Sequence, residues 1–195
     1  MTLHRCIDVS RDPCKTYLDA HALGFDTVLT SGAAGSCLQG METIGRLLQL
    51  RDAYQGPEVL VGAGVNASVI LEEGAEKIIT KGDISAFAAA GADIILLPAP
   101  GTVPGITMEY VREMVQYAHS RGCLTITAIG TSQEGADTAT IRQIALMCKM
   151  TGTDIHHLGD AGYGGMALPE NIQAYSIAIR GIRHTYRRMA GSVNR

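Results

Sequence analysis

The hydrophobic pattern of the chain repeats one arrangement four times. In each copy a helix-like stretch closes at a glycine, a short run rich in Ile, Leu, Val and Thr follows, and glycine or small polar residues come next. Glycine suits the left-handed conformation that ends a helix, and a near-continuous apolar run is typical of a parallel strand buried on both faces. The copies span residues 22–32, 89–99, 120–130 and 150–160, and segments 3–9 and 58–65 are also predicted as strands.

Apolar residues at helical spacing fill the intervals between these strands. In the interval 136–151 the apolar stripe consists of Ile141, Ile144, Ala145 and Cys148, and Asp137 is placed to cap the helix. The predicted helices are residues 12–23, 39–54, 81–90, 106–121, 136–151 and 169–190.

These elements form about six βα units within one α/β domain covering residues 1–195. Repetition of such units builds either a (β/α) TIM barrel or an open doubly wound parallel sheet. A complete barrel of eight units usually takes about 250 residues. We therefore predict a TIM-barrel-like fold that is incomplete or completed in an oligomer, with the open doubly wound sheet as the alternative. Both architectures place ligands at the carboxyl ends of the strands.

Composition narrows the class of protein further. Charged residues make up 18% of the chain and hydrophobic residues 46%, which is typical of a globular protein. No stretch approaches the roughly 20 apolar residues of a membrane span, and the first ten residues lack a signal-peptide pattern. The five cysteines include no C-x-x-C pair. We expect reduced thiols in a cytoplasmic protein without a membrane partner.

Charge is distributed unevenly along the chain. The net charge is −3, but no acidic residue follows Glu170, and the last segment carries five arginines. That segment is therefore +5 and the remainder −8. Because the protein is acidic and aromatic residues are sparse among the arginines, we predict no nucleic-acid partner. A solvated face, or a face that docks onto a neighbouring subunit of a homo-oligomer, is favoured; an arginine here could also reach an anionic ligand.

The stretch "AIGTSQEGAD" (128–137) is the leading candidate site. It joins a strand to a helix, and backbone N–H groups with two hydroxyls are suited to a phosphate or carboxylate. The alternative is a loop without a ligand, whose hydroxyls only satisfy the hydrogen bonds of the turn itself. Glu134 would be a general acid/base or a metal ligand, because two anions repel. The predicted anion-binding residues are Gly130, Thr131 and Ser132, with Ser31, Gly32 and Gly64 at other strand ends.

Histidines mark the strand end "DIHHLGDAGYGG" (154–165). Alternation places His156 on one face and His157 on the other, so that one faces the sheet interior and the other the helix layer. Histidine with a nearby carboxylate supports acid/base catalysis or metal binding. We predict His156 and His157 as catalytic partners of Glu134, and Asp160 as a metal ligand. A buried histidine bound to a carboxylate is the structural alternative.

The first predicted strand, "LHRCIDV" (3–9), presents His4, Cys6 and Asp8 on one face. Three in-line residues span too great a length for one ion to meet all of them, so at most two could bind a metal. His4 and Asp8 are the predicted metal ligands here, and the predicted cofactor is a divalent metal, Mg or Cu.

Two stretches of the chain resemble known families. Residues 3–70 resemble part of the copper homeostasis protein CutC family through "LHRCIDVSRDP", "LGFDTVLTSG" and "VLVGAGVNA". Residues 72–195 resemble an uncharacterised bacterial barrel-like family carrying phosphonomutase-like labels, through "ADIILLPAPGTVPGIT" and "PENIQAYSIAIRGIRHTYRRMA". The chain looks like a splice of two barrel fragments, and the first resemblance implies copper binding.

Three functional hypotheses follow. The first is an enzyme (a lyase, isomerase or hydrolase) that acts on a small anionic or phosphorylated metabolite at the strand ends. The second is a CutC-like copper-binding protein without catalysis. The third is a partial barrel that works only as an oligomer, because exposed strand edges favour pairing with another chain.

Overall fold

The computed structural model describes residues 2–3, 5–34, 39–62, 79–130, 133–160 and 167–191. The predicted site residues His4, Gly64, Thr131 and Ser132 lie outside this part of the chain. The described strands are β1 (Thr2–Leu3), β2 (Thr27–Thr30), β3 (Glu58–Gly62), β4 (Ile94–Pro98), β5 (Leu124–Ile129) and β6 (Ile155–Leu158).

Helices alternate with these strands, and each predicted helix is present with ends shifted by at most two residues. They are α1 (Pro13–Ala22), α2 (Met41–Tyr54), α4 (Lys81–Ala89), α5 (Met108–Ser120), α6 (Thr138–Thr151) and α7 (Pro169–Met189). Side chains cap several of them. Asp137 caps α6 as predicted, and Thr80 with Asp83 forms a reciprocal capping box on α4. None of the helices described is long and apolar enough to cross a membrane.

The sheet has the strand order β1-β2-β3-β4-β5-β6. The pairings β1–β2, β2–β3 and β3–β4 are parallel, with Leu3 opposite Val28, and Leu29 opposite Leu60. A doubly wound sheet reverses its strand order at a switch point, and this sheet does not reverse. The fold class is therefore the incomplete, TIM-barrel-like α/β arrangement, and the doubly wound alternative is wrong.

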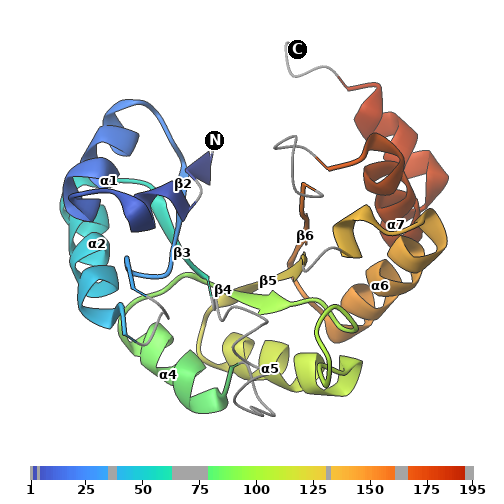
Figure 1. The fold of residues 1–195 in the computed structure, drawn as a ribbon, viewed down its shortest axis with the longest axis horizontal. Helices are drawn as coiled ribbons and strands as arrows, with labels where there is room; N and C mark the ends of the chain where they lie inside the picture. Colours follow the sequence, from blue (N-terminus) through green and yellow to red (C-terminus); the bar gives the residue numbers. More distant parts are fainter. Residues whose placement is uncertain are drawn as a thin grey trace. The chain divides into compact units, whose positions relative to one another are not determined.

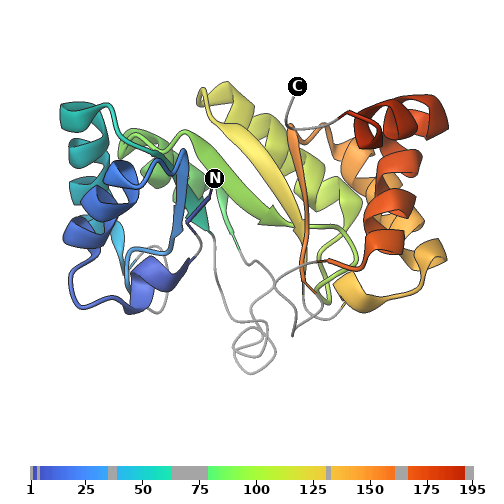
Figure 2. The same ribbon diagram turned by 90° about the horizontal axis from the view of Figure 1, so that it is seen from above.

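Two compact units make up the chain. The first comprises Met1–Leu97 and Met114–Ile126, and the second Pro98–Glu113 and Thr127–Arg195. In the first unit, α1 and α2 lie side by side (Figures 1 and 2). The side chains of β4 alternate in burial, as expected of a pleated strand. Ile95 and Leu97 are fully buried, whereas Ile94 and Leu96 are only partly buried. Ile94 and Leu96 pack with an apolar cluster of Leu29, Leu60 and Ile126.

The second unit has its own core between the strand ends and two helices. There α6 and α7 lie side by side (Figures 1 and 2). The predicted stripe of α6 is buried against Tyr175 of α7 and Ile129 of β5. The core cluster consists of Ala99, Ile129, Ile141, Ile144, Ala145, Cys148, Ala174 and Tyr175.

The prediction of a strand over residues 3–9 is wrong for residues 5–9. Arg5–Val9 forms a 3-10 helix, η1, in which Ile7 is fully buried, Cys6 is exposed and Ser10 closes the turn onto the Ile7 carbonyl. The turn follows from the carboxylate of Asp8, which is bonded to the end of β2. Cys6 and Asp8 therefore do not share one face of a strand.

The terminal helix is also not continuous. Gly181 interrupts α7 with φ 79° and ψ 165°, a conformation that essentially only glycine adopts. Beyond it the chain packs back, and the buried Thr185 hydroxyl lies 3.0 Å from that of Ser176. The arginines of residues 169–190 therefore do not follow one straight helical face.

Substituting Gly181 tests this break. We expect Gly181→Ala to lower the free energy of unfolding by about 1–3 kcal/mol, because alanine is strained in this conformation. Gly45→Ala is the matched control. Gly45 lies inside α2 with open space where a Cβ would project, so alanine there should raise stability by about 0.5–1 kcal/mol. Urea denaturation measures both, and a stabilising Gly181→Ala would contradict the break.

Candidate functional site

The turn after β2 already holds a carboxylate, that of Asp8. The backbone N–H and the hydroxyl of Ser31 donate to Asp8 Oδ2 at 2.9 and 2.8 Å, and the Ala33 N–H donates to Oδ1 at 3.1 Å. The Thr30 hydroxyl is a further donor to Oδ1. This predicted anion-binding turn therefore binds an anion that belongs to the chain itself.

Asp8 is consequently held in its charged form. Burial alone would raise the pKa of this carboxyl, but the hydrogen bonds from Thr30, Ser31 and Ala33 outweigh burial and lower it. Gly32 keeps the turn against the start of α2, since a Cβ there would lie 2.3 Å from the Gly40 carbonyl oxygen. The contacts of Asp8, Ser31 and Gly32 thus stabilise the junction between η1, β2 and α2.

The loop after β5 is held by one buried amide. Its residues Gln133–Gly135 form the short helix η2, and the Asn171 side chain donates to the carbonyls of Glu134 and Ala136 at 3.0 and 2.9 Å. Asn171 lies in the first turn of α7 and is 1% exposed. The amide therefore fixes the backbone that carries Glu134.

Glu134 lies against the end of β6. A Cβ at Gly159 would approach the Glu134 Cγ and carboxyl carbon to 3.3 and 3.4 Å, and the Gly159 N–H donates to the Ile129 carbonyl of β5 at 3.0 Å. Glu134 Oε2 is buried and has no hydrogen-bond partner among the residues described. A buried oxygen left without a partner costs about 1–3 kcal/mol, and more when the group is charged.

The helix that follows contributes little to an anion site. Asp137 accepts the N–H groups of Ala139 and Thr140 at 2.8 and 3.1 Å, so its own carboxylate occupies the amides that start α6.

His156 faces α7. Its Nδ1 lies 2.8 Å from the Tyr175 hydroxyl, and the two rings meet edge to face with centroids 5.5 Å apart. Burial lowers the pKa of His156, and the positive charges of Arg180 and Lys149 lower it further. Burial also raises the pKa of Tyr175, which hydrogen-bonds Cys148. The side chain of His156 is therefore biased towards the neutral imidazole.

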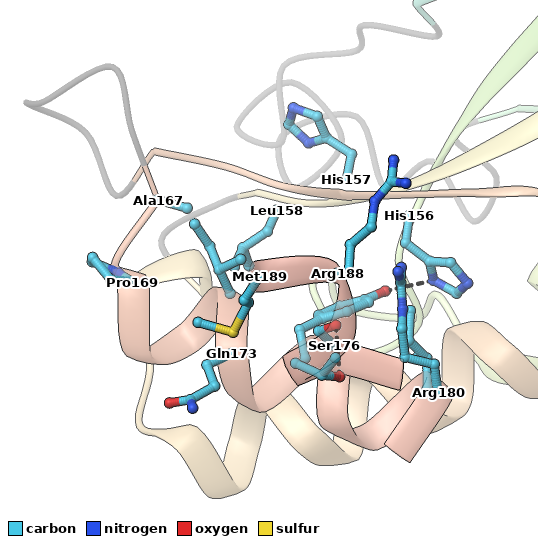
Figure 3. Close-up of a pocket in the computed structure, with 14 residues that line it drawn as sticks. His156, His157, Leu158, Ala167, Pro169, Gln173, Ser176, Arg180, Arg188 and Met189 are labelled. Carbon is cyan, nitrogen blue, oxygen red and sulfur yellow. Dashed lines mark hydrogen bonds between the residues drawn. The ribbon is translucent and has the colours of Figure 1, made fainter. Parts of the chain in front are cut away.

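The other predicted residues of β6 are placed differently. Leu158 packs on the core of the second unit, whereas His157 points away from α7 (Figure 3), as the alternation predicts. Asp160 is exposed. Across the part of the chain that the structure describes, no three His, Cys, Asp or Glu side chains gather as a metal site would require.

A cavity of about 780 Å³ lies between β6 and α7 (Figure 3). Its polar lining includes His156, Ser176, Arg180 and Arg188, and its apolar lining includes Ile172, Ile179 and Met189.

The sequence pattern did not identify Asn171 or Tyr175 as site residues. The available signal for Asn171 was an amide near a helix start, which is common for other reasons. Tyr175 lies on the buried face of α7 and is typical of a core aromatic. Only the tertiary contacts assign them to Glu134 and His156.

Fold and strand-end geometry define an incomplete β/α-barrel protein. The chain belongs to the family described as Domain of unknown function (DUF7916), whose model matches residues 9–195. That single match covers residues 72–195 and all of the segment 3–70 except residues 3–8.

The N-terminal segment is similar to CutC family proteins. It is 50% identical over 68 residues to a CutC family protein of Xanthomonas campestris pv. campestris strain B100, which is 35% of this chain and 28% of that protein. A CutC family protein of Xylella fastidiosa is 49% identical over 72 residues, 37% of this chain and 26% of that protein. The match thus spans only about a quarter of these relatives, and confirms a partial likeness to CutC.

Solved structures confirm the fold class. Deoxyribose phosphate aldolase from Aeropyrum pernix matches with a TM-score of 0.61 at 12% identity, over 92% of this chain and 70% of that one. A putative deoxyribose-phosphate aldolase from Coccidioides immitis matches with a TM-score of 0.64 at 15% identity, over 93% of this chain and 66% of that one. At these identities the likeness concerns the fold alone.

Replacing Asp8 tests its structural role. We expect Asp8→Asn to lower the free energy of unfolding at pH 7 by about 2 kcal/mol, because charge-assisted hydrogen bonds are weakened. The stabilisation from Asp8 is present above the ordinary pKa of 3.8 and is lost as pH falls through the lowered folded-state pKa. Urea denaturation at pH 7 and pH 3 should show a smaller difference between variant and wild type at pH 3.

The control is Asp19→Asn. Asp19 makes an exposed i,i+4 pair with Lys15, so its loss should change stability by no more than about 0.5 kcal/mol. Equal effects of the two substitutions would contradict the role given to Asp8.

Proposed function

We propose that the protein is an enzyme that transfers a proton in a small anionic or phosphorylated metabolite, with Glu134 as general acid/base. The observation that carries the proposal is that Glu134 Oε2, buried where β5 and β6 end, has no hydrogen-bond partner among the described residues. Active sites of β/α barrels lie at the carboxyl ends of their strands.

The surroundings of Glu134 support a catalytic role over a structural one. Its backbone is tied down by Asn171, yet one carboxylate oxygen has no partner among the described groups. A structural carboxylate normally accepts several hydrogen bonds, as Asp8 does. A substrate proton or a divalent cation such as Mg²⁺ would supply the missing partner.

The anionic character of the substrate rests on two supports. Gly130 directly follows β5, and Thr131 and Ser132 come next in the sequence; their hydroxyls are donors that suit a phosphate or a carboxylate. The similar barrels from A. pernix and C. immitis carry names that include deoxyribose phosphate, a phosphorylated sugar. The substrate proposed here shares that chemical class.

Proton transfer is favoured over covalent amine chemistry. A Schiff base requires a lysine amine, and none of the strands β1–β6 contains a lysine. His157, on the face of β6 directed away from α7, is the proposed second proton-transfer group. His156 is less suited to that role because its Nδ1 lies against Tyr175.

Ligand binding and turnover test the proposal together. We expect inorganic phosphate and dihydroxyacetone phosphate, each with Mg²⁺, to raise the melting temperature. A ligand at 100 times its Kd stabilises by about 2.7 kcal/mol. In D₂O, we expect the protein to accelerate exchange of the carbon-bound protons of dihydroxyacetone phosphate, followed by NMR. Glu134→Gln should slow that exchange by about 10²–10⁴-fold and keep the thermal shift.

Glu170→Gln is the control, because it removes an equal charge from an exposed position at the start of α7. It should leave both measurements unchanged. Phosphates and Mg²⁺ that leave the melting temperature unaltered would contradict the proposal, as would equal exchange rates for Glu134→Gln and wild type.

A further inference from the structure

The cavity between β6 and α7 has uncovered apolar walls. Ile172 is 47% exposed and Met189 is 64% exposed, and both line the cavity together with Ile179 and Leu158. Its volume of about 780 Å³ falls within the usual range of small-molecule pockets, about 300–1,000 Å³. The walls would bury the apolar part of a ligand.

The charged groups of the cavity are all basic. Arg180 and Arg188 belong to its lining, and no Asp or Glu does. Neither arginine forms an ion pair with any described residue. An arginine without a carboxylate partner keeps its guanidinium donors available for a carboxylate, sulfonate or phosphate.

The break at Gly181 brings the two arginines to one cavity. In a continuous helix, residues eight apart would lie about 12 Å apart along the axis. Here the segment after Gly181 packs back through Thr185 and Ser176. Figure 3 shows Arg180 beside His156 and Arg188 extending towards β6.

We propose that this cavity binds a small amphipathic anion, with its acidic group held by Arg180 and Arg188 and its apolar body against Ile172, Ile179 and Met189. The cavity lining does not include Glu134, although it includes His157, and binding through the two arginines does not depend on the proposed enzymatic function. His156, whose pKa is lowered by burial and by Arg180 and Lys149, would gain from the ligand a negative charge that offsets this repulsion.

Two fluorescent probes of similar apolar size test the proposal. One is the anion 8-anilinonaphthalene-1-sulfonate, and the other is the neutral N-phenyl-1-naphthylamine. Removing both lining arginines in the double variant Arg180→Gln/Arg188→Gln should weaken binding of the anion at least tenfold. Binding of the neutral probe should change less than twofold, because the apolar walls remain.

The double variant Arg183→Gln/Arg187→Gln is the matched control. It removes the same charge from the same helix, at positions outside the cavity lining. We expect less than a twofold effect on either probe. If both double variants weakened binding of the anionic probe equally, the cause would be the overall positive charge of the basic segment, and the proposal would be overturned. Unchanged binding of that probe in both double variants would also overturn it.

A filling substitution locates the probes independently. Gln173 is partly buried and lines the cavity. The larger side chain of Gln173→Trp should fill the cavity and weaken binding of both probes at least fivefold, and circular dichroism would show whether the variant is folded. If a folded Gln173→Trp protein binds both probes as wild type does, the probes lie elsewhere and the proposal fails. If that variant does not fold, the two arginine variants still decide the outcome.

Discussion

One buried side chain, Asn171, fixes the loop that carries Glu134 in the second unit. Its amide binds two carbonyls of the loop after β5, and it stands at the start of the helix that packs on α6. An amide supplies two donors in a fixed plane, so loop and helix cannot shift independently without leaving buried groups unsatisfied. The position of Glu134 beside Gly159 therefore depends on how α7 begins. About one turn further along the same helix, the Tyr175 hydroxyl lies against His156 of β6.

The carboxylates of the chain differ in how fully they are hydrogen-bonded. Asp8 and Asp137 accept several hydrogen bonds each, and both have lowered pKa values, which is how a carboxylate stabilises a turn or a helix start. Glu134 has an oxygen without such bonds among the described groups. Proteins retain groups that cost stability where activity requires them. The contrast separates Asp8 and Asp137, which stabilise the fold, from Glu134, the proposed general acid/base.

Periodicity predicted most of the architecture, because helices and buried strands depend on local patterns. The stripe of α6 and its Asp137 cap are examples. Residues 5–9 were wrongly predicted as a strand because Asp8 is hydrogen-bonded to residues more than twenty positions away in the sequence. The break at Gly181 was not predicted, because a single glycine is tolerated within a helical pattern. The alternation of β6 and the place of Glu134 between β5 and α6 were predictable from the local pattern. Their contacts with Asn171 and Tyr175 required knowledge of which helix packs on which loop.

The glycine within α7 also divides the segment into parts that need not unfold together. Backbone hydrogen bonds do not pass continuously through a residue at φ 79° and ψ 165°, so Ile182–Met189 depends on tertiary contacts such as that of Thr185. Short helices are marginal by themselves, and such segments exchange their amide hydrogens through local opening. A molecule that contacted both sides of the glycine would join the two parts into one cooperative unit. Protection of the amides after residue 181 would then report occupancy of the cavity at a distance from the ligand itself.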